Sequence, residues 1–313
     1  MLKLAKRVLL GATLLLPLTT HAGIFKMFRS KPYPEAFFSG QLLAVAEAIK
    51  KQDIEKAKQL AEKLPDIDAP GVEHFTLLAF AVADTNIPAI KMLMALGADP
   101  AAKLDDTVIG SVDVSQTVAH FAMWRKTTQA LRAMLEAGMD TEIKRGSRTL
   151  IFDVPTLKEN DSLKLLVEFG ADVNARDSLG NTVLFRFISV MWDEALYLLD
   201  NGADPFVMRS SGVTAAYAVQ DILDSMNKSS EAYQKVLKIQ QKMIAMGVKF
   251  PALTPYGERY RLDIVWCDDP VGYLTRSECK LVGENEYIAP QSEESKRADE
   301  KILRERYGID AKL

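Results

Sequence analysis

The sequence predicts an all-α protein, a solenoid of helix-turn-helix pairs with short β-hairpin connections. Five blocks along the chain each begin with a threonine and two apolar residues, continue with apolar residues at helical spacing, and end at a glycine. One helix pair has too little inner surface to fold alone, so neighbouring pairs must stack and bury a continuous core. The repetition therefore decides the fold class before any single element is considered.

The threonines that open the five blocks are Thr76, Thr117, Thr149, Thr182 and Thr214, at successive steps of 41, 32, 33 and 32 positions. A threonine hydroxyl in front of a helix accepts a backbone N–H that the helix leaves unpaired. Each threonine therefore marks an expected helix start.

The glycines at the block ends are Gly97, Gly138, Gly170, Gly202 and Gly247. Glycine tolerates the left-handed backbone conformation that closes many helices. Each glycine is thus expected to end the second helix of its pair.

This pattern resembles the ankyrin repeat, which has a period of ~33 residues and a threonine at the opening of its first helix. The clearest match runs from Gly170 to Thr182, and the resemblance spans residues 34–250. None of the blocks has the family's proline after the threonine, and only the second has its histidine, His120. The resemblance implies a protein-binding solenoid in which His120 organises its repeat by bonding to neighbouring backbone, rather than acting in catalysis.

The chain divides into four expected segments: a signal peptide at 1–22, an N-terminal capping helix pair at 34–70, five ankyrin-like repeats at 71–250, and a C-terminal cap at 251–313. The capping pair is expected at 42–50 and 54–64, because the exposed end of a solenoid needs polar outer residues. The last segment lacks the repeat. We expect an irregular cap that ends in a charged helix at about 292–307, with a small separate domain as the alternative.

Residues 1–22 have the order of a secretory signal peptide. A basic start precedes an apolar stretch from Val8 to Leu18, and cleavage is expected after Ala22. An uncleaved membrane anchor is the alternative, but a spanning helix needs about 20 apolar residues. We expect an exported, soluble, periplasmic protein with no membrane span after cleavage.

Composition and charge narrow the class of protein. The 313 residues include 39 Lys and Arg against 42 Asp and Glu, a formal charge of −3, and 48% are hydrophobic. This composition excludes a disordered or collagen-like chain, and the lack of a basic domain argues against nucleic-acid binding. Signal cleavage would remove 3 of the 39 bases and no acid, so that 36 face 42 at a charge of −6. A partner with a basic surface is the electrostatic expectation.

The inventory of reactive residues is small. Cys267 and Cys279 are expected to form a disulfide in an oxidising compartment, with two unrelated thiols as the alternative. Neither they nor His74 and His120, the two histidines outside the signal peptide, have the spacing of a metal site. No nucleophile elbow, phosphate loop or zinc-protease motif is present. We therefore expect no metal, no cofactor and no enzymatic activity, with an active site in 251–313 as the remaining alternative.

Two blocks are longer than the others. Roughly eight residues are added within Lys103 to Ser115, where the resemblance places a hairpin, and the last block is extended around Ser225 to Glu231. Loops that exceed their template are more often functional than structural, although drift of the surface sequence is the alternative. We expect a longer hairpin in the first case and longer helices in the second.

The resemblance implies that partners contact the hairpin tips and the inner face of the first helices. The residues expected at the tips are Val72, Glu73, His74, Asp113, Val114, Gln116, Arg145, Ser147, Arg148, Ser178, Leu179, Asn181, Ser210, Ser211 and Val213, and those expected on the inner face are Asp84, Trp124, Arg125, Ser189 and Asp221. Trp124 is the expected anchor because tryptophan is over-represented among residues that dominate binding energy, with packing against the adjacent helix pair as the alternative. Alanine at Trp124, Leu179 or Arg145 is expected to weaken binding with little loss of stability.

Binding to another protein is therefore the expected function. Export without an anchor, an acidic concave surface and the lack of catalytic motifs favour an immunity or inhibitor protein that neutralises a toxic effector, such as one delivered by a type VI secretion system. The alternative is a periplasmic accessory or scaffold protein that supports a stress-defence enzyme such as a catalase. The identity of a neighbouring gene product would distinguish the two.

Overall fold

The computed structural model describes residues 32–106, 108–109, 112–125, 127–155, 161–178, 180–209, 212–265 and 292–313. The chain forms two compact units, Met1–Ala98 and Asp99–Leu313. The predicted signal peptide, Leu179, Ser210, Ser211 and both cysteines lie outside the described residues. The disulfide between Cys267 and Cys279 stays a prediction.

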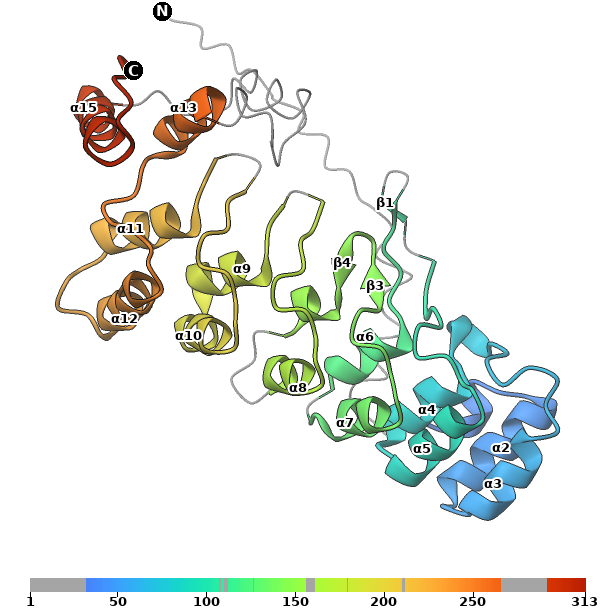
Figure 1. Ribbon diagram of the computed structural model, residues 1–313. Coiled ribbons are helices and arrows are strands. Elements are labelled where there is room, and N and C mark those ends of the chain that lie inside the picture. Colours follow the sequence, from blue (N-terminus) through green and yellow to red (C-terminus); the bar gives the residue numbers. More distant parts are fainter. Residues whose placement is uncertain are drawn as a thin grey trace, which may run out of the picture. The chain divides into compact units, whose positions relative to one another are not determined.

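The first unit contains two helix pairs, and the leading pair lies where it is predicted (Figure 1). α2 lies beside α4, and α3 lies beside α5. Every side chain from Leu77 to Ala83 is buried, so α4 is the core helix of this unit. The elements are η1 (Pro34–Ala36), α2 (Gly40–Lys50), α3 (Ile54–Ala61), η2 (Val72–His74), α4 (Leu77–Asp84) and α5 (Ile87–Ala95).

The second unit is built of helix pairs whose first and second helices form two layers (Figure 1). First helices of successive pairs lie side by side, as α9 and α11 do, and second helices do the same, as α10 and α12 show. None of the helices within the described ranges is both long and apolar enough to cross a membrane. The helical elements are α6 (Val118–Met123), α7 (Gln129–Glu136), η3 (Leu150–Asp153), α8 (Ser162–Glu168), α9 (Val183–Val190), α10 (Trp192–Asp200), α11 (Ala215–Ser225) and α12 (Glu231–Ala245).

Two short antiparallel hairpins lie in the described part of the second unit, one before α6 and one before η3. β1 (Val108–Ile109) pairs with β2 (Val112–Asp113), and β3 (Lys144–Arg145) pairs with β4 (Arg148–Thr149). The first hairpin falls in the first predicted insertion, and α11 and α12, with 11 and 15 residues, are the longer helices expected around the second. The predicted hairpin in the first insertion and the predicted longer helices around the second are thus confirmed.

Three of the five block threonines cap their helices as predicted. Thr76, Thr117 and Thr214 each accept a hydrogen bond from the backbone N–H three positions on, at 3.2, 3.4 and 3.1 Å. The hydroxyls of Thr149 and Thr182 are buried with no hydrogen-bond partner among the described residues. All five block-end glycines have φ between 88° and 99°, which confirms the left-handed helix endings.

Thr214→Val is expected to lower the free energy of unfolding by about 1 kcal/mol, because valine keeps the shape of threonine but lacks the hydroxyl that caps α11. Thr182→Val is the matched control. Its hydroxyl is buried and unpaired in the described part of the chain, so its removal is expected to leave stability unchanged or to raise it. Urea unfolding measures both variants, and a larger loss from Thr182→Val would contradict this capping assignment.

The third block departs from the predicted pair of α-helices. Its first element, η3, is a single turn of 3-10 helix, because Pro155 follows it and a residue before proline avoids the α conformation. Val154 is accordingly extended, with φ −56° and ψ 135°. The short element leaves the backbone carbonyls of Phe152 and Val154 without helical partners, and both accept hydrogen bonds from Arg186 of the next repeat.

The C-terminal segment is more regular than predicted. α13 (Pro255–Val265) is a helix where an irregular cap is expected, and it lies beside α15 (Glu293–Ile302). α15 continues into a π-helix, η4 (Leu303–Tyr307), so the charged terminal helix is confirmed. The two helices meet closely at Gly257, where a Cβ atom would lie 2.5 Å from the carboxylate of Asp299. This contact joins segments far apart in sequence, which a search for local repeats does not detect.

Candidate partner-binding groove

A groove of about 420 Å³ lies in the second unit, between the first helical elements and the hairpins of neighbouring repeats. Its walls are aromatic and charged, and three of the charged side chains are arginines. We call it the arginine groove. Its lining residues are Trp124, Arg148, Phe152, Asp153, Asp177, Asn181, Thr182, Phe185, Arg186 and Arg209.

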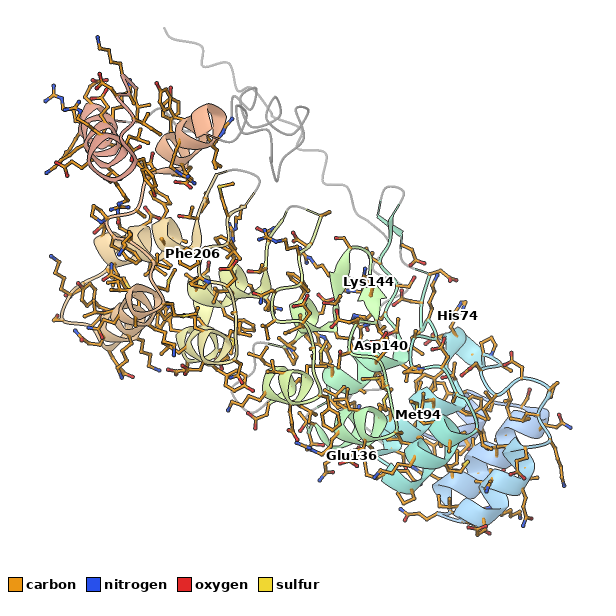
Figure 2. The ribbon with its side chains drawn as sticks, viewed as in Figure 1. His74, Met94, Glu136, Asp140, Lys144 and Phe206 are labelled. Carbon is orange, nitrogen blue, oxygen red and sulfur yellow. The ribbon has the colours of Figure 1, made fainter. Side chains whose placement is uncertain are left out.

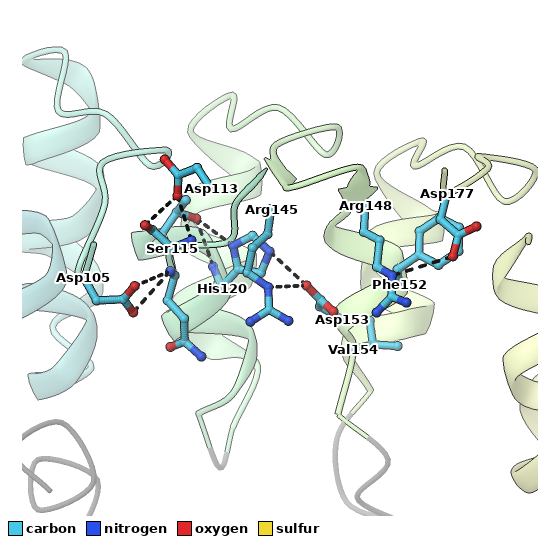
Figure 3. Close-up of polar contacts among 12 residues, drawn as sticks. Asp105, Asp113, Ser115, His120, Arg145, Arg148, Phe152, Asp153, Val154 and Asp177 are labelled. Carbon is cyan, nitrogen blue, oxygen red and sulfur yellow. Dashed lines mark hydrogen bonds and ion pairs between the residues drawn. The ribbon is translucent and has the colours of Figure 1, made fainter. Parts of the chain in front are cut away.

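Asp153 is a buried acid that lines the groove, and Figure 3 shows its contacts. Arg145 Nε donates a 2.8 Å hydrogen bond to Asp153 Oδ2, and His120 Nε2 lies 3.5 Å from the same oxygen. His120 is itself buried, and its Nδ1 shares a 2.8 Å hydrogen bond with Thr117 Oγ1. The histidine therefore joins two repeats through side chains, in place of the backbone contact that the family resemblance implies.

The pKa of Asp153 reflects two opposing causes. Burial alone raises the pKa of a carboxyl, but the nearby His120 ring and the hydrogen bond and charge of Arg145 outweigh it and hold the pKa of Asp153 below its ordinary value of 3.8. The carboxylate form is therefore more stable in the folded protein than in the unfolded chain.

The contribution of Asp153 to stability is expected to disappear at low pH. The unfolded chain takes up the proton near pH 3.8 and the folded protein only below it, so stability is present above this window and lost as the pH falls through it. Urea unfolding of the wild type and Asp153→Asn, from about pH 5 to about pH 2, measures the effect. The difference in unfolding free energy between the two proteins should shrink, and a constant difference would contradict the assignment.

Arg186 joins the third and fourth repeats. Its guanidinium donates hydrogen bonds to the carbonyl oxygens of Phe152 and Val154, the latter at 2.9 Å. These are the carbonyls that the interrupted helix η3 leaves free. Half-burial lowers the pKa of Arg186, the charge of Asp153 raises it, and that of Arg148 lowers it. The contacts fix a cationic group in the groove wall.

The turn before α9, closed by an antiparallel bridge between Arg176 and Thr182, supplies the second acid of the groove. Asp177 accepts hydrogen bonds from the backbone and side-chain N–H groups of Asn181, at 2.9 and 3.1 Å. Arg148 Nε lies 3.8 Å from Asp177 Oδ2, and the Arg148 side chain is 51% exposed. Asn181 thus holds the loop, whereas Arg148 stays accessible at the rim.

Aromatic rings complete the walls. The guanidinium carbon of Arg209 lies 4.5 Å from the centroid of the Phe185 ring. Trp124, at the end of α6, is 47% exposed and lines the groove, which favours a groove position over packing against the adjacent helix pair. A large exposed ring beside cations is the kind of surface that anchors a protein partner.

The structure brings Trp124, Arg148 and Asn181 of the predicted contact residues together in the groove. Several of the others lie on hairpins and loops outside it. Ser178 N donates to Ser147 Oγ at 3.3 Å, which links two neighbouring loop tips. The exposed or half-buried residues outside the groove are Val72, Glu73, His74, Asp113, Val114, Gln116, Arg125, Ser147, Ser178, Ser189, Val213 and Asp221.

Two of these side chains have local partners that the sequence does not reveal. Lys103 pairs with Asp113, and this contact, together with Ser115, holds the pKa of Asp113 well below its usual range. Arg125 lies over the Phe121 ring at 5.5 Å, and burial lowers the pKa of Arg125. The first contact lies within the first hairpin insertion, and the second lies at the end of α6.

One expectation is wrong. Asp84 is expected on an exposed inner face, but its side chain is only 4% exposed and lies 2.8 Å from Lys50 Nζ. The expectation that Arg145→Ala costs little stability is revised, because the contact of Arg145 with the buried Asp153 predicts a destabilising change. Asp84 pairs with Lys50 in the first unit, and Arg145 pairs with Asp153 in the second.

The groove also contains residues that the repeat pattern did not predict, chiefly Asp153, Asp177, Arg186 and Arg209. Asp153 and Arg186 stand four positions after their block threonines, where the first two blocks have Phe80 and Phe121. The fifth block has Ala218 there, so a charged side chain at this position is a signal for a polar contact between repeats. Among the described residues, no group of histidine, cysteine and acidic side chains is arranged to hold a metal ion.

Solved ankyrin-repeat structures are similar to this chain. The ankyrin repeat domain of Bcl-3, a member of the IkappaB family, shares 19% identity at a TM-score of 0.53, over 77% of this chain and 97% of that one. An ankyrin repeat domain from Acinetobacter baumannii shares 24% identity, over 66% and 98% of the two chains, at a TM-score of 0.49. A chain from the complex of a predatory endopeptidase of Bdellovibrio bacteriovorus with an immunity protein shares 20% identity, over 62% and 97%, at 0.43.

No protein-family model and no curated protein matches the sequence. The likeness to the Bcl-3 domain concerns the fold alone, and it agrees with the capped helix starts, the left-handed glycine endings and the hairpins of this chain. The chain has the ankyrin-repeat fold, the all-α solenoid that its sequence predicts.

Proposed function

We propose that this protein is a non-enzymatic inhibitor that binds and neutralises a toxic effector protein in the periplasm, in the manner of an immunity protein. The ankyrin-repeat fold indicates a protein-binding module. The observation that carries the proposal is the arginine groove, which places the exposed ring of Trp124 beside three arginines on one surface. Tryptophan and arginine are enriched among the residues that dominate binding energy.

The interactions within the groove support a preformed binding surface. Arg186 and Asn181 are held by hydrogen bonds to neighbouring backbone and side chains, and Arg209 is held against the Phe185 ring. Side chains that are already fixed lose less conformational entropy when a partner binds. Such a surface suits tight inhibition of one protein.

Export and charge support the location and the class of partner. The signal-like segment at residues 1–22 favours the periplasm, and its removal would leave a formal charge of −6. A net negative protein attracts basic surfaces over several ångströms and speeds their encounter. We therefore propose a toxic effector with a basic surface, with delivery by a type VI secretion system as one route.

Co-expression tests the proposal. Each product of a gene adjacent to that of this protein would be directed to the periplasm of a test strain, with and without the full-length chain. We expect one such product to arrest growth and the full-length chain to restore it. A chain that lacks residues 1–22 is the matched control, and it should give no rescue. Lack of rescue for every toxic neighbour would overturn the proposal, and co-purification with a catalase instead would support the scaffold alternative.

A further inference from the structure

The arginine groove has a local charge opposite to that of the whole chain, so the expectation of an acidic concave surface is wrong at this groove. The chain carries a formal charge of −3, yet the groove lining has three arginines against two aspartates. The groove lining therefore has one more cationic than anionic side chain, and the exposed ring of Trp124 lines the same groove.

Both aspartates of the groove already accept hydrogen bonds from other donors. Asp153 accepts one from Arg145, which does not line the groove, and Asp177 accepts its hydrogen bonds from Asn181. Arg148 is 3.8 Å from Asp177, beyond the length of a hydrogen bond. The two aspartates thus neutralise only part of the positive charge of the three arginines.

Arg186 and Arg209 pair with no carboxylate within 4.0 Å among the described residues. Arg186 donates to two backbone carbonyls, which leaves other N–H groups, because a guanidinium has five. Arg209 contacts the face of the Phe185 ring, and its buried Nε has no acceptor in the described part of the chain. These guanidiniums are held in place by neutral groups while their charge is not neutralised by a direct acid partner.

We propose that the arginine groove binds an internal acidic segment of the partner protein, with a glutamate or aspartate side chain on its arginines and an apolar neighbour on Trp124. Carboxylate is the group that the planar guanidinium recognises best, through paired charge-assisted hydrogen bonds. The inference rests on the proposed function only in taking the partner to be a protein.

An acidic segment is compatible with a partner whose surface is basic overall. Net charge governs the long-range attraction, which is screened over about 8 Å at physiological salt. The half-buried guanidinium of Arg186 acts at contact distance, where screening is weak. A basic protein that presents one acidic loop would meet both conditions.

Synthetic peptides test the inference without the natural partner. The probe is a short fluorescent peptide of alternating glutamate and leucine, acetylated and amidated at its ends, and its binding to the purified full-length chain is followed by fluorescence anisotropy. We expect it to bind at least about tenfold more tightly than a counterpart with glutamine for glutamate, since one charge-assisted contact accounts for a factor of this size. Its affinity should fall as salt is raised.

Variants locate the site. Arg209→Gln and Arg148→Gln are each expected to weaken binding of the glutamate peptide about tenfold. Arg148 is half-exposed, so its variant should fold even if the other does not. Arg132→Gln is the matched control, because Arg132 lies outside the groove and pairs with Glu168 on the surface. Its variant should bind as the wild type does.

Three outcomes would overturn the inference: equal affinity for the glutamate and glutamine peptides, equal loss in the Arg132 control, or binding only by a glutamine peptide with a free C-terminal carboxylate. Peptide binding without growth rescue would contradict the proposed immunity function and leave the acidic-segment inference standing. Full growth rescue by the Arg148→Gln and Arg209→Gln variants would contradict the acidic-segment inference and leave the proposed function standing.

Discussion

Asp153→Ala is expected to lower the free energy of unfolding by about 3 kcal/mol, because it removes the buried acid that accepts the hydrogen bond of Arg145 and lies beside the buried His120. Asp153 is 8% exposed and lies 2.8 Å from Arg145 Nε. The Arg145 side chain is 30% exposed, so it is partly desolvated. Without Asp153 the favourable Coulomb energy is lost, and the cost of desolvating Arg145 remains. Urea unfolding followed by circular dichroism measures the change.

Glu168→Ala is the matched control for this prediction. Glu168 accepts two hydrogen bonds of 3.0 Å from Arg132, so its contact is at least as well formed as that of Asp153. Arg132 and Glu168 both lie at the surface, where water screens the pair. We therefore expect a change in the free energy of unfolding close to the error of the measurement. Equal losses for the two variants would show that burial is not the cause of the large effect at Asp153.

Trp124→Ala is expected to weaken binding of the effector about 30-fold, or about 2 kcal/mol, because it removes the exposed ring at the centre of the proposed contact. The ring is only half-buried, so stability should change little. Calorimetric titration of the effector identified by growth rescue measures the affinity, and urea unfolding of the same variant measures the stability.

Phe206→Ala is the control for a general loss of apolar surface. Phe206 is 61% exposed and lies outside the arginine groove, in the turn that follows α10 (Figure 2). We expect its variant to bind the effector as the wild type does. If Phe206→Ala weakened binding and Trp124→Ala did not, the partner would contact another face of the second unit.

The fold was predictable because its determinants are local and repeated. Thr76 and Thr214 start helices through hydrogen bonds to residues three positions away, and Gly97 ends one through its own backbone conformation. Signals of this range can be read from sequence alone. The π-helical end of α15 and the contact of Gly257 with Asp299 were not predictable, since they depend on segments that meet only after folding.

The groove was predictable in outline and not in its chemistry. The resemblance placed Trp124 and Arg148 on a shared surface, but their partners come from different repeats. Arg186 bonds to carbonyls that are free because Pro155 shortens η3, and Asp153 contacts a histidine of the preceding repeat. Repeat periodicity predicts which positions face each other. It does not predict which atoms of those positions remain unpaired.

Titration of the effector's toxic activity with purified protein tests the central claim that this chain is a binding inhibitor acting through the arginine groove. An equimolar amount of the wild type or of Phe206→Ala is predicted to abolish the activity, whereas the same amount of Trp124→Ala leaves most of it. Full inhibition by Trp124→Ala would contradict the assignment of the groove. Loss of the activity at far less than equimolar protein would show turnover, and would contradict a binding inhibitor.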